Sequence, residues 1–519
     1  MSITTERLHS HFDFIVCGAG TAGCVVAGRL AENPEVRVLL IEAGGCDDHE
    51  HVSEPCNWPL NLGSARDWNF TAASNPHLND RQIPLNMGRG LGGGSSVNVM
   101  LWARGHKNDW EDYAAEAGDP AWNYASVLKI YQRVEDYWGA PDSTRRGVGG
   151  PVHVSPAREI QPIASAMLGA AAEMGIPTFE DPNGPMMEGR GGAAINDLIV
   201  KDGKRHSIYR AYVHPRRDQP NLTVLTDTLV SRLLFAGHRV VGVEAINEGR
   251  LQRFYADAEV ILSLGAVNTP KVLMQSGIGP EEELSRHGIP VIQHLPGVGA
   301  NHQDHVSFAA IFEYETPQPI GYGGSEATLY WSSDSALRLP DMFHCQVQFP
   351  IPSAENAALD VPAHGWTMFA GLAHPQSRGR ITLSGPAVTD APIIQTNTLS
   401  HPADVRCALE NIRFVQELGA QASFKGLVKG ERLPGKLDAK ALENYARNAA
   451  VTYWHQSCTA KMGQDPMSVV DSQLRVYGLQ GLRIADASIL PHVPSGNTMA
   501  PCVVIGERAV EEIRATHGI

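Results

Sequence analysis

A histidine near the end of the chain has a setting in which it could move protons. His455 lies in the stretch TYWHQSCTAKMG, residues 452–463, directly after a tryptophan. An imidazole has a pKa near neutral pH, so it can take a proton from a substrate hydroxyl group. A zinc site with Cys458 is disfavoured, because no second pair of cysteine or histidine ligands lies nearby. His49 and His51 are expected in a solvated loop, so we predict no metal site. For His455, the alternative of a histidine packed in the core stays open.

Three glycines near the start of the chain have the spacing of a dinucleotide site. A short apolar run at 14–16 predicts a buried parallel strand, and Gly18, Gly20 and Gly23 follow it in a GxGxxG pattern. Such glycines permit a tight turn, close approach of the backbone to a pyrophosphate, and close packing of the next helix. The second expected strand, VRVLLIEA, ends in Glu42, 19 residues after the third glycine. An acid there accepts hydrogen bonds from ribose hydroxyls, which suits FAD or NAD and not NADP.

Two further stretches contain glycine at positions that suit contact with a flat ligand. GRGLGGGSSVNVMLWARG covers residues 88–105, and GAVNTPKVLMQSGIG covers residues 265–279 at the end of an apolar strand. Dense glycine lets the main chain lie against a ring system, because no Cβ atoms intervene. A flexible exposed linker is the alternative for the first stretch, but Val97, Met100 and Trp102 are unusual linker residues.

With these stretches, the chain resembles the glucose–methanol–choline (GMC) family of FAD-dependent oxidoreductases. Both stretches match the two signature patterns of that family, and LPGVGANHQDH at 295–305 matches a third segment. GLRIADASILPHVPSGNTMAP at 481–501 and the following IGERAVEEI match near the C-terminus. One departure is His302, which stands where leucine is expected. The resemblance covers essentially the whole chain.

The resemblance implies an α/β fold in two parts. One part is a Rossmann-like, doubly wound FAD-binding domain, and the other is a discontinuous substrate domain built on an antiparallel sheet. We expect the FAD-binding domain in segments 10–155, 221–310 and 459–519. The substrate domain is expected in segments 156–220 and 311–458.

The resemblance also implies which residues contact the cofactor. Val230 should meet the adenine through backbone atoms, Asp486 should lie by the pyrophosphate, and Asn98 and Val99 should flank the isoalloxazine. Some relatives attach FAD covalently through a histidine at the position that Val97 fills here, so non-covalent FAD is expected. The predicted cofactor residues are Gly18, Gly20, Thr21, Ala22, Glu42, Ala43, Leu91, Gly93, Ser96, Asn98, Val99, Met100, Val230, Asp486, Ala487, Thr498 and Met499.

The same resemblance implies two catalytic residues. His455 matches the catalytic histidine of the family, and Asn497 matches a second position that relatives fill with histidine or asparagine. Oxidising an alcohol with a flavin moves a hydride from the carbinol carbon and removes a hydroxyl proton. Because asparagine cannot take a proton, we expect His455 to act as the base and Asn497 to orient the hydroxyl.

A helix is expected directly after Asn497. Its apolar stripe follows SGNTMAP, with Pro501 at the first helical position and Asn497 or Thr498 near the cap. The N-terminus of a helix carries partial positive charge. Pointed at the flavin, it would stabilise the negative charge that the ring acquires with the hydride.

The substrate is expected to be an aromatic or heteroaromatic primary alcohol such as pyridoxine. Trp454 offers a flat wall, although a tryptophan packed in the core is the alternative. The stretch DMFHCQVQFPIP, residues 341–352, predicts an alternating strand whose His344 and Gln346 could contact substrate, with a solvated sheet face as the alternative. Tyr453 and Met100 add to the aromatic and apolar character.

Other activities of the same fold stay open. Hydroxymethylfurfural or aryl-alcohol oxidation and choline-type dehydrogenation are alternatives, although no acidic residue can be assigned to a quaternary ammonium pocket. A hydroxynitrile lyase would use the same histidine without redox turnover. Photodecarboxylation is disfavoured by His455, because that chemistry needs no base.

Composition narrows the partners and the compartment. The chain has 519 residues, 43% of them hydrophobic and 19% charged, with a net charge of −14 and no basic run, so nucleic acid is not expected. No segment has 18 uninterrupted apolar residues, and the N-terminus shows no leader pattern, so neither a membrane span nor secretion is expected. Eight scattered cysteines without a CxxC pair favour reduced thiols in the cytoplasm. Oxygen and another electron acceptor stay open, as does the oligomeric state.

Overall fold

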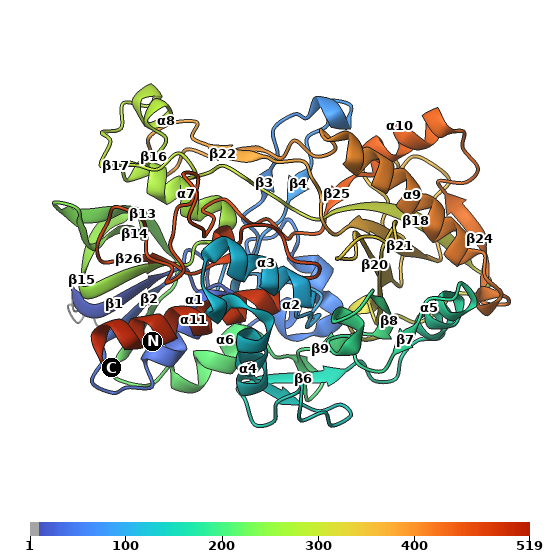
Figure 1. Cartoon of the computed structure of the whole chain (residues 1–519), viewed down its shortest axis with the longest axis horizontal. Helices are drawn as coiled ribbons and strands as arrows, with labels where there is room; N and C mark the ends of the chain where they lie inside the picture. The colour runs from blue at the N-terminus through green and yellow to red at the C-terminus, as the bar shows by residue number, and fades with distance from the viewer. Residues whose placement is uncertain (1–9) are drawn as a thin grey trace.

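The computed structural model describes residues 10–519 and contains two large β-sheets. One sheet lies on the left of Figure 1 and the other on the right, with loops and short elements between them. The expected absence of a leader concerns residues 1–9, which lie outside the described residues. Within residues 10–519, no helix is both long and apolar enough to cross a bilayer.

The left-hand sheet has seven strands and supplies the core of the Rossmann-like part. Strands β12, β2, β1, β15 and β26 run parallel, and β14 and β13 extend the sheet antiparallel from β15. Every residue of β2 is buried, as expected for a parallel strand covered on both faces. The strands are β1 (His11–Cys17), β2 (Val38–Ile41), β12 (Leu222–Leu225), β13 (Thr228–Ala236), β14 (Arg239–Asn247), β15 (Arg250–Leu262) and β26 (Leu482–Ile484).

Two helices from opposite ends of the chain pack closely against this sheet. Helix α1 (Thr21–Leu30) follows the GxGxxG turn, and α11 (Met499–His517) lies beside it (Figure 1). A Cβ on Gly506 of α11 would lie 2.6 Å from the Cβ of Val25, so glycine lets the two helices approach. Helix α7 (Gly265–Gln275) begins where β15 ends.

The right-hand sheet has eight strands and is antiparallel except for the pair β7 and β8. Helices α5 (Pro162–Glu173) and α9 (Pro402–Gly419) pack on it. The strands are β7 (Thr178–Phe179), β8 (Gly192–Ile195), β18 (Val306–Tyr314), β19 (Ala327–Trp331), β20 (Met342–Val347), β21 (Gly365–Leu372), β24 (Val428–Leu433) and β25 (Val451–Thr452).

The remaining elements are short or connect the two sheets. The helices are α2 (Glu50–Ser53), α3 (Lys107–Ala117), α4 (Tyr124–Val134), α6 (Ile208–Tyr212), α8 (Glu281–Arg286) and α10 (Ala439–Ala449). The strands are β3 (Phe70–Thr71), β4 (Pro84–Leu85), β5 (Glu135–Tyr137), β6 (Val152–Pro156), β9 (Asp197–Leu198), β10 (Val200–Lys201), β11 (Lys204–Arg205), β16 (Ile278–Gly279), β17 (Gln293–His294), β22 (Arg380–Thr382) and β23 (Ile393–Gln395).

The predicted fold class is confirmed: a mostly parallel sheet of doubly wound type is joined to a second, antiparallel sheet. The strands of each sheet come from segments that alternate along the chain much as the predicted domains do. One difference is that β18 begins at Val306, inside the segment 221–310 expected in the FAD-binding domain. The domain boundaries themselves stay a prediction.

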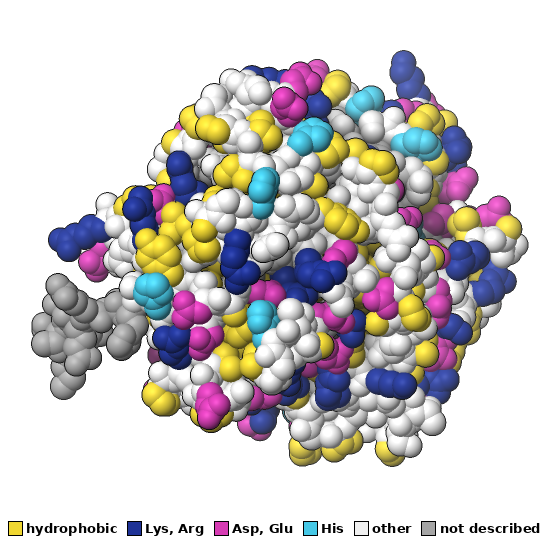
Figure 2. Space-filling view, turned by 60° about the vertical axis from the view of Figure 1, so that its left-hand side comes forward, with side chains coloured by type: hydrophobic (Ala, Val, Ile, Leu, Met, Phe, Trp, Pro, Cys, Tyr) yellow, Lys and Arg dark blue, Asp and Glu magenta, His cyan; other side chains and the backbone are white. Residues whose placement is uncertain are grey.

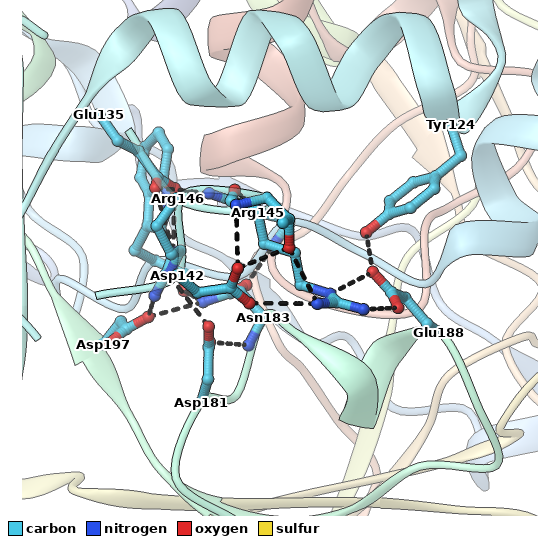
Figure 3. A network of polar contacts seen from close by, with 12 residues as sticks. Tyr124, Glu135, Asp142, Arg145, Arg146, Asp181, Asn183, Glu188 and Asp197 are labelled. Carbon is cyan, nitrogen blue, oxygen red and sulfur yellow. Dashed lines mark hydrogen bonds and ion pairs between the residues drawn. The ribbon is translucent and has the colours of Figure 1, made fainter. Parts of the chain in front are cut away.

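A buried ion network fixes the end of the glycine-rich loop. Arg104, at the end of that loop, pairs with Glu135 at 2.5 Å, and Arg146 pairs with the same carboxylate at 3.1 Å and also with Asp197. All four side chains are almost fully buried, and Figure 3 shows Glu135, Arg146 and Asp197 converging on one another. Toward the surface the network continues through Arg145 and its neighbours Asp142 and Glu188.

The surface shows mixed charge. On the face drawn in Figure 2, acidic and basic side chains are interspersed, and no continuous basic stripe crosses it. The expectation that nucleic acid is not a partner stays a prediction.

Candidate active site

A large cavity of about 690 Å³ extends between the two parts of the protein. Its wall includes the turn between β1 and α1, part of β13, and the first residues of α7 and α11. It also includes residues of β20 and β21 and the segment that follows β25. The cavity therefore joins the expected dinucleotide site to the expected substrate region.

Two glycines of the GxGxxG turn are required by the protein's own packing. Gly18 has φ +98°, and a Cβ there would lie 2.3 Å from the carbonyl oxygen of Ser263. A Cβ on Gly23 would lie 1.9 Å from the carbonyl oxygen of Gly18. These clashes explain the first and third glycines without reference to a ligand.

Three other glycines leave space on the cavity side. The nearest atom to a Cβ built on Gly20 is 3.9 Å away, and no atom lies within 4 Å of one built on Gly94 or Gly265. All three line the cavity. The packing around Gly20 and Gly94 does not require glycine, and Gly265 needs it only for its φ of +81°. The bare main chain is therefore left open to a ligand, which is the fit that a dinucleotide needs.

Glu42 joins three loops at the floor of the cavity. Its carboxylate accepts hydrogen bonds from the backbone N–H groups of Ala19 and Gly44, both at 2.9 Å, and of Gly90 at 3.0 Å. Burial raises its pKa, and these donors oppose that effect. A carboxylate has about four acceptor positions, so Glu42 can still accept a bond from a ribose hydroxyl.

Asp486 holds the N-terminus of α7 at the cavity. It accepts hydrogen bonds from the Gly265 N–H at 2.9 Å, the Thr269 hydroxyl at 2.6 Å and the Ser488 N–H at 2.8 Å. Asp486, Gly265 and Ala266 all line the cavity. A helix N-terminus offers free N–H groups and partial positive charge, which suit a phosphate.

Most of the predicted cofactor residues line the cavity. Leu91, Ser96 and Met100 are not part of its wall. The Ser96 hydroxyl donates to the Leu91 carbonyl at 2.6 Å, and Met100 is fully buried with φ +63°. These three residues therefore shape the glycine-rich loop from behind. The predicted residues that line the cavity are Gly18, Gly20, Thr21, Ala22, Glu42, Ala43, Gly93, Asn98, Val99, Val230, Asp486, Ala487, Thr498 and Met499.

The two predicted catalytic residues meet in the cavity although 42 residues separate them. The side-chain nitrogen Nδ2 of Asn497 lies 3.1 Å from Nε2 of His455. On the other side of the ring, Nδ1 of His455 lies 2.8 Å from Nδ1 of His305. The backbone N–H of His455 donates to Asp304 at 2.9 Å. Backbone and side chain of His455 are thus held at three points.

The loop that carries His455 is held in an unusual conformation. Trp454 has φ +62°, a left-handed conformation that few residues other than glycine adopt. Its N–H donates to the Thr452 hydroxyl at 2.6 Å, and that hydroxyl contacts the carboxylate of Asp304. Asp304 also accepts from Gln456 at 2.9 Å. Burial raises the pKa of Asp304 to about 7, and hydrogen bonds from Thr452, His455, Gln456 and the backbone of His305 oppose this rise.

Burial keeps both imidazoles neutral. It lowers the pKa of His455 well below the ordinary value, and the repulsion that two protonated rings would feel beside each other, with His305, lowers it further. Burial also lowers the pKa of His305 to about 4. His455 therefore has a free ring lone pair over a wide range of pH.

The helix expected after Asn497 is present, with its first turn at the cavity. α11 begins at Met499 with Thr498 as the N-cap residue, and Thr498, Met499 and Cys502 line the cavity. Pro501 is the third helical residue, not the first as predicted, because the helix already begins two residues earlier. Proline tolerates this position because N–H groups of the first turn have no intrahelical partner.

Aromatic side chains surround His455. Tyr453 stacks on it with ring centroids 5.9 Å apart and planes 3° apart, and Phe369 packs edge-on against Tyr453. Trp454 lines the cavity, and its ring lies 6.3 Å from that of Trp58. Trp58 lies in the 3-10 helix η1 (Pro55–Asn61), and no motif in that stretch indicated its role.

The substrate-strand prediction is partly wrong. The alternation is correct, but His344 and Gln346 face away from the cavity and are fully buried. They therefore lie neither at the cavity, as predicted, nor on a solvated sheet face, the alternative. Helix α9 covers that face, and its Asn411 bonds Nε2 of His344 at 2.5 Å. The opposite face supplies Cys345 and Val347 to the cavity wall. Sequence alternation gave the two faces of the strand but not which of them is turned to the cavity.

One group of possible metal ligands occurs among residues 10–519: Asp109, His374 and His492. Asp109 accepts hydrogen bonds from the N–H of His106 at 2.7 Å and from the N–H of Ser495 at 2.8 Å. The first of these contacts belongs to the capping box of α3. These hydrogen bonds account for the buried carboxylate.

Comparison with known proteins identifies the family. Two models for GMC oxidoreductases match, over residues 12–307 and 375–506. The mitochondrial choline dehydrogenase of Mus musculus is 36% identical over 97% of this chain and 89% of that protein. An oxygen-dependent choline dehydrogenase of Stenotrophomonas maltophilia is 35% identical over 98% of this chain and 95% of that protein.

The chain also resembles a solved structure in its fold. The crystal structure of pyridoxine 4-oxidase from Mesorbium loti matches with a TM-score of 0.93 and 30% identity, over 98% of this chain and 99% of that one. The chain therefore belongs to the GMC oxidoreductases, FAD-dependent enzymes that act on CH–OH donors.

Proposed function

We propose that this GMC oxidoreductase oxidises a neutral aromatic or heteroaromatic primary alcohol to its aldehyde, with His455 as the base. The observation that carries the proposal is the contact between Nε2 of His455 and the amide of Asn497 inside the cavity. Bound FAD would accept the hydride from the carbinol carbon. The residues of the chain then have to hold the alcohol, take its hydroxyl proton and exclude water.

The polar pair suits a hydroxyl group. An amide N–H only donates, and the lone pair on Nε2 of His455 only accepts. A substrate oxygen beside both atoms would accept the Asn497 N–H in place of Nε2 and donate its own proton to Nε2 of His455. Because burial lowers the pKa of His455, the ring is neutral and able to accept at neutral pH.

The cofactor end of the cavity suits a non-covalent dinucleotide. The open glycine backbone, Glu42 and the N-terminus of α7 offer groups that hold riboses and phosphates. Val97 lines the cavity, and its aliphatic side chain offers no nucleophile for a covalent bond to the ring.

The aromatic wall favours a flat substrate. Four aromatic side chains line the cavity around His455: Trp58, Phe369, Tyr453 and Trp454. They can pack face-on or edge-on against the ring of a substrate. Such a wall also suits a quaternary ammonium group through cation–π contacts. The charges of the cavity are therefore the feature that separates the two substrates.

Among residues 10–519, no carboxylate on the cavity wall near the aromatic side chains is free to pair with a cation. Asp67 is the acid of that region, and it accepts four hydrogen bonds, from Gly63, Asn69, Asn86 and Met87. Arg66 beside it lines the cavity, and within residues 10–519 its guanidinium contacts Asn61 and His51 and no acid. A positive charge there disfavours a quaternary ammonium ion and tolerates a neutral or electron-rich ring.

Choline-type oxidation is the second candidate, because the choline dehydrogenases are 35–36% identical to this chain. Anaerobic mixing with pyridoxine, hydroxymethylfurfural, benzyl alcohol and choline separates the two. We expect the flavin absorbance to bleach fastest with a heteroaromatic or benzylic alcohol and to return in air or with an added acceptor. Fastest bleaching by choline would overturn the proposed substrate. Flavin that stays yellow with every alcohol, together with cleavage of mandelonitrile, would indicate a lyase.

A further inference from the structure

The immediate partner of His455 is a second buried histidine rather than a carboxylate. The Nδ1 atoms of His305 and His455 are 2.8 Å apart, and the two rings are nearly perpendicular, with planes 88° apart. His305 is fully buried and is not part of the cavity wall. It follows Asp304, which binds the backbone of His455, so one short segment holds both the main chain and the ring of the base.

The hydrogen bonds fix where the protons are. Two ring nitrogens at 2.8 Å must share one proton, because two lone pairs or two N–H groups would repel. The amide nitrogen of Asn497 can only donate, so Nε2 of His455 is the acceptor of that contact. Neutral His455 then carries its proton on Nδ1 and donates it to Nδ1 of His305. Neutral His305 therefore carries its own proton on Nε2.

The surroundings of His305 agree with this assignment. Backbone carbonyls of Pro494 and Ala373 face the ring and favour its protonated form. Nε2 of His305 is buried and has no hydrogen-bond partner of standard geometry among residues 10–519. Carbonyl oxygens close to the ring stabilise an N–H better than a lone pair, so they favour a proton on Nε2.

We propose that His305 is a positioning residue that holds His455 in the tautomer with a free Nε2 and accepts the Nδ1 proton when the alcohol is deprotonated. The inference rests on the proposed role of His455 as the base. The alcohol O–H bond breaks and its proton bonds to Nε2 of His455. The Nδ1–H bond of His455 then breaks as that proton passes to Nδ1 of His305. No electrons are exchanged, and one positive charge moves from the first ring to the second.

Few other charges face the pair. The rings of Phe343 and Tyr453 pack edge-on against His305, and burial raises the pKa of Tyr453 well above its ordinary value, so it stays neutral. Asp304 is the nearest carboxyl group, and its side chain is turned to Thr452 and Gln456. His374 is near enough for its charge and that of His305 to repel, and burial keeps His374 neutral.

The hydrogen-bond partner of His305 can be changed without removing the base. Asparagine at 305 keeps an acceptor oxygen close to the position of Nδ1 but cannot take a proton, and leucine removes both functions. His302, three residues earlier and also buried, has no hydrogen-bond partner on either ring nitrogen and is not part of the cavity wall. His302→Leu is therefore a matched control for the loss of a buried imidazole from the same segment.

The first test is anaerobic bleaching of the holoenzyme by its best alcohol. Removing the partner that orients a functional imidazole commonly costs ~10–100-fold, and we expect that loss for His305→Leu. His305→Asn should stay within about five-fold of the wild type, since the acceptor is kept, and H302L should match the wild type. Wild-type rates in His305→Leu would overturn the inference.

Mixtures of H2O and D2O then test the transfer itself. Two moving protons give a curved dependence of rate on deuterium content, and one gives a straight line. We expect curvature in the wild type and a straight line in His305→Asn, because an amide cannot take the second proton. A straight line in both proteins would overturn the transfer to His305.

A measurement without turnover separates this inference from the proposed function. In holoenzyme labelled with ¹⁵N-histidine, NMR distinguishes a protonated from a bare ring nitrogen. We expect His455 to show a bare Nε2 in the wild type and in His305→Asn, and a mixture of tautomers in His305→Leu. A wild-type His455 protonated on Nε2 would refute the inference even if alcohols bleach the flavin. The expected spectrum with no bleaching by any alcohol would refute only the proposed function.

Discussion

The buried ion network around Arg146 and the cavity corner around His455 bury polar groups in opposite ways. In the network, each buried charge touches a charge of opposite sign, as Glu135 touches both Arg104 and Arg146. Burial alone would raise the pKa of Glu135, but the two arginines hold it below the ordinary value. In the corner, the ring nitrogens of His455 contact the neutral side chains of His305 and Asn497. Burial there is not compensated, and it keeps the imidazole uncharged.

The difference separates groups that hold a shape from groups that exchange a proton. A buried carboxylate between two guanidinium groups keeps its charge at any ordinary pH, so it cannot act as an acid or base. A buried imidazole without a counter-ion changes charge as soon as a neighbouring hydroxyl loses its proton. The network fixes the end of the loop at residues 97–105, and that loop forms one wall of the cavity in which His455 acts.

Removing the base should have the largest effect on activity. His455→Ala should slow anaerobic flavin bleaching by ~10²–10⁴-fold, the usual contribution of a positioned base. The visible spectrum of bound FAD and the melting temperature should change little, because the ring contributes to the cavity wall and not to the ion network. Rapid mixing at saturating alcohol measures the rate. A variant that bleaches at the wild-type rate would show that another group takes the proton.

Breaking the network should instead affect stability. Glu135→Gln leaves Arg104 and Arg146 buried without their shared anion, and such uncompensated burial costs about 3–5 kcal/mol. Denaturant unfolding of the holoenzyme measures this loss. The bleaching rate of the fraction that stays folded should remain within a few-fold of the wild type. A large rate loss without a stability loss would mean that the network acts on the chemistry after all.

The two regions also differ in how far the sequence predicted them. Gly18 and Glu42 stand in a motif whose spacing is tied to dinucleotide binding, whereas His455 and Asn497 were assigned through the family resemblance. The structure brings all four to one cavity. The partner of the base was not predicted, although LPGVGANHQDH ends in His305. The distance between two rings 150 residues apart depends on the packing of β18 and β25, which no local pattern contains.

The function of the right-hand sheet was harder to predict from the sequence for a related reason. Alternation along β20 is visible in the sequence, but both faces of the strand are buried, one under α9 and one at the cavity. Polar residues therefore do not mark the functional face. His344 is held by Asn411 beneath the helix, whereas Cys345 faces the cavity. Only the tertiary position of α9 decides between the two.

The pH dependence of stability separates the ion network from a buried neutral imidazole, His302, in the segment that holds His455. Burial lowers the pKa of His302 from 6.5 to about 4, so the unfolded chain binds more protons between these values. The contribution of His302 to the free energy of unfolding is thus present above pH 6.5 and is lost as the pH falls toward 4. The contribution of Glu135 is lost only as the pH falls below about 4.5. His302→Leu should remove roughly 2 kcal/mol of the stability difference between pH 7.5 and pH 5. Unfolding at the two pH values measures it, and an unchanged difference would mean that His302 is charged in the folded protein.

The smallest effect is expected at the neutral partner on the cavity side of His455. Asn497→Ala removes an N–H donor to the hydroxyl but leaves the base and its contact with His305 in place. A lost hydrogen bond to a neutral oxygen costs about 0.5–1.5 kcal/mol, so the bleaching rate should fall about ten-fold or less.

The pH profile shows whether the two residues have separate roles. Because burial lowers the pKa of His455, bleaching should stay fast below the ordinary pKa of histidine and decrease only in more acidic solution. Asn497→Ala should keep this acidic limb, since asparagine takes no proton, and His455→Ala should lose it. If the limb disappeared in Asn497→Ala and persisted in His455→Ala, the proton-exchanging group of the cavity would be a side chain other than His455. The comparison with the ion network would then have to be made from that side chain.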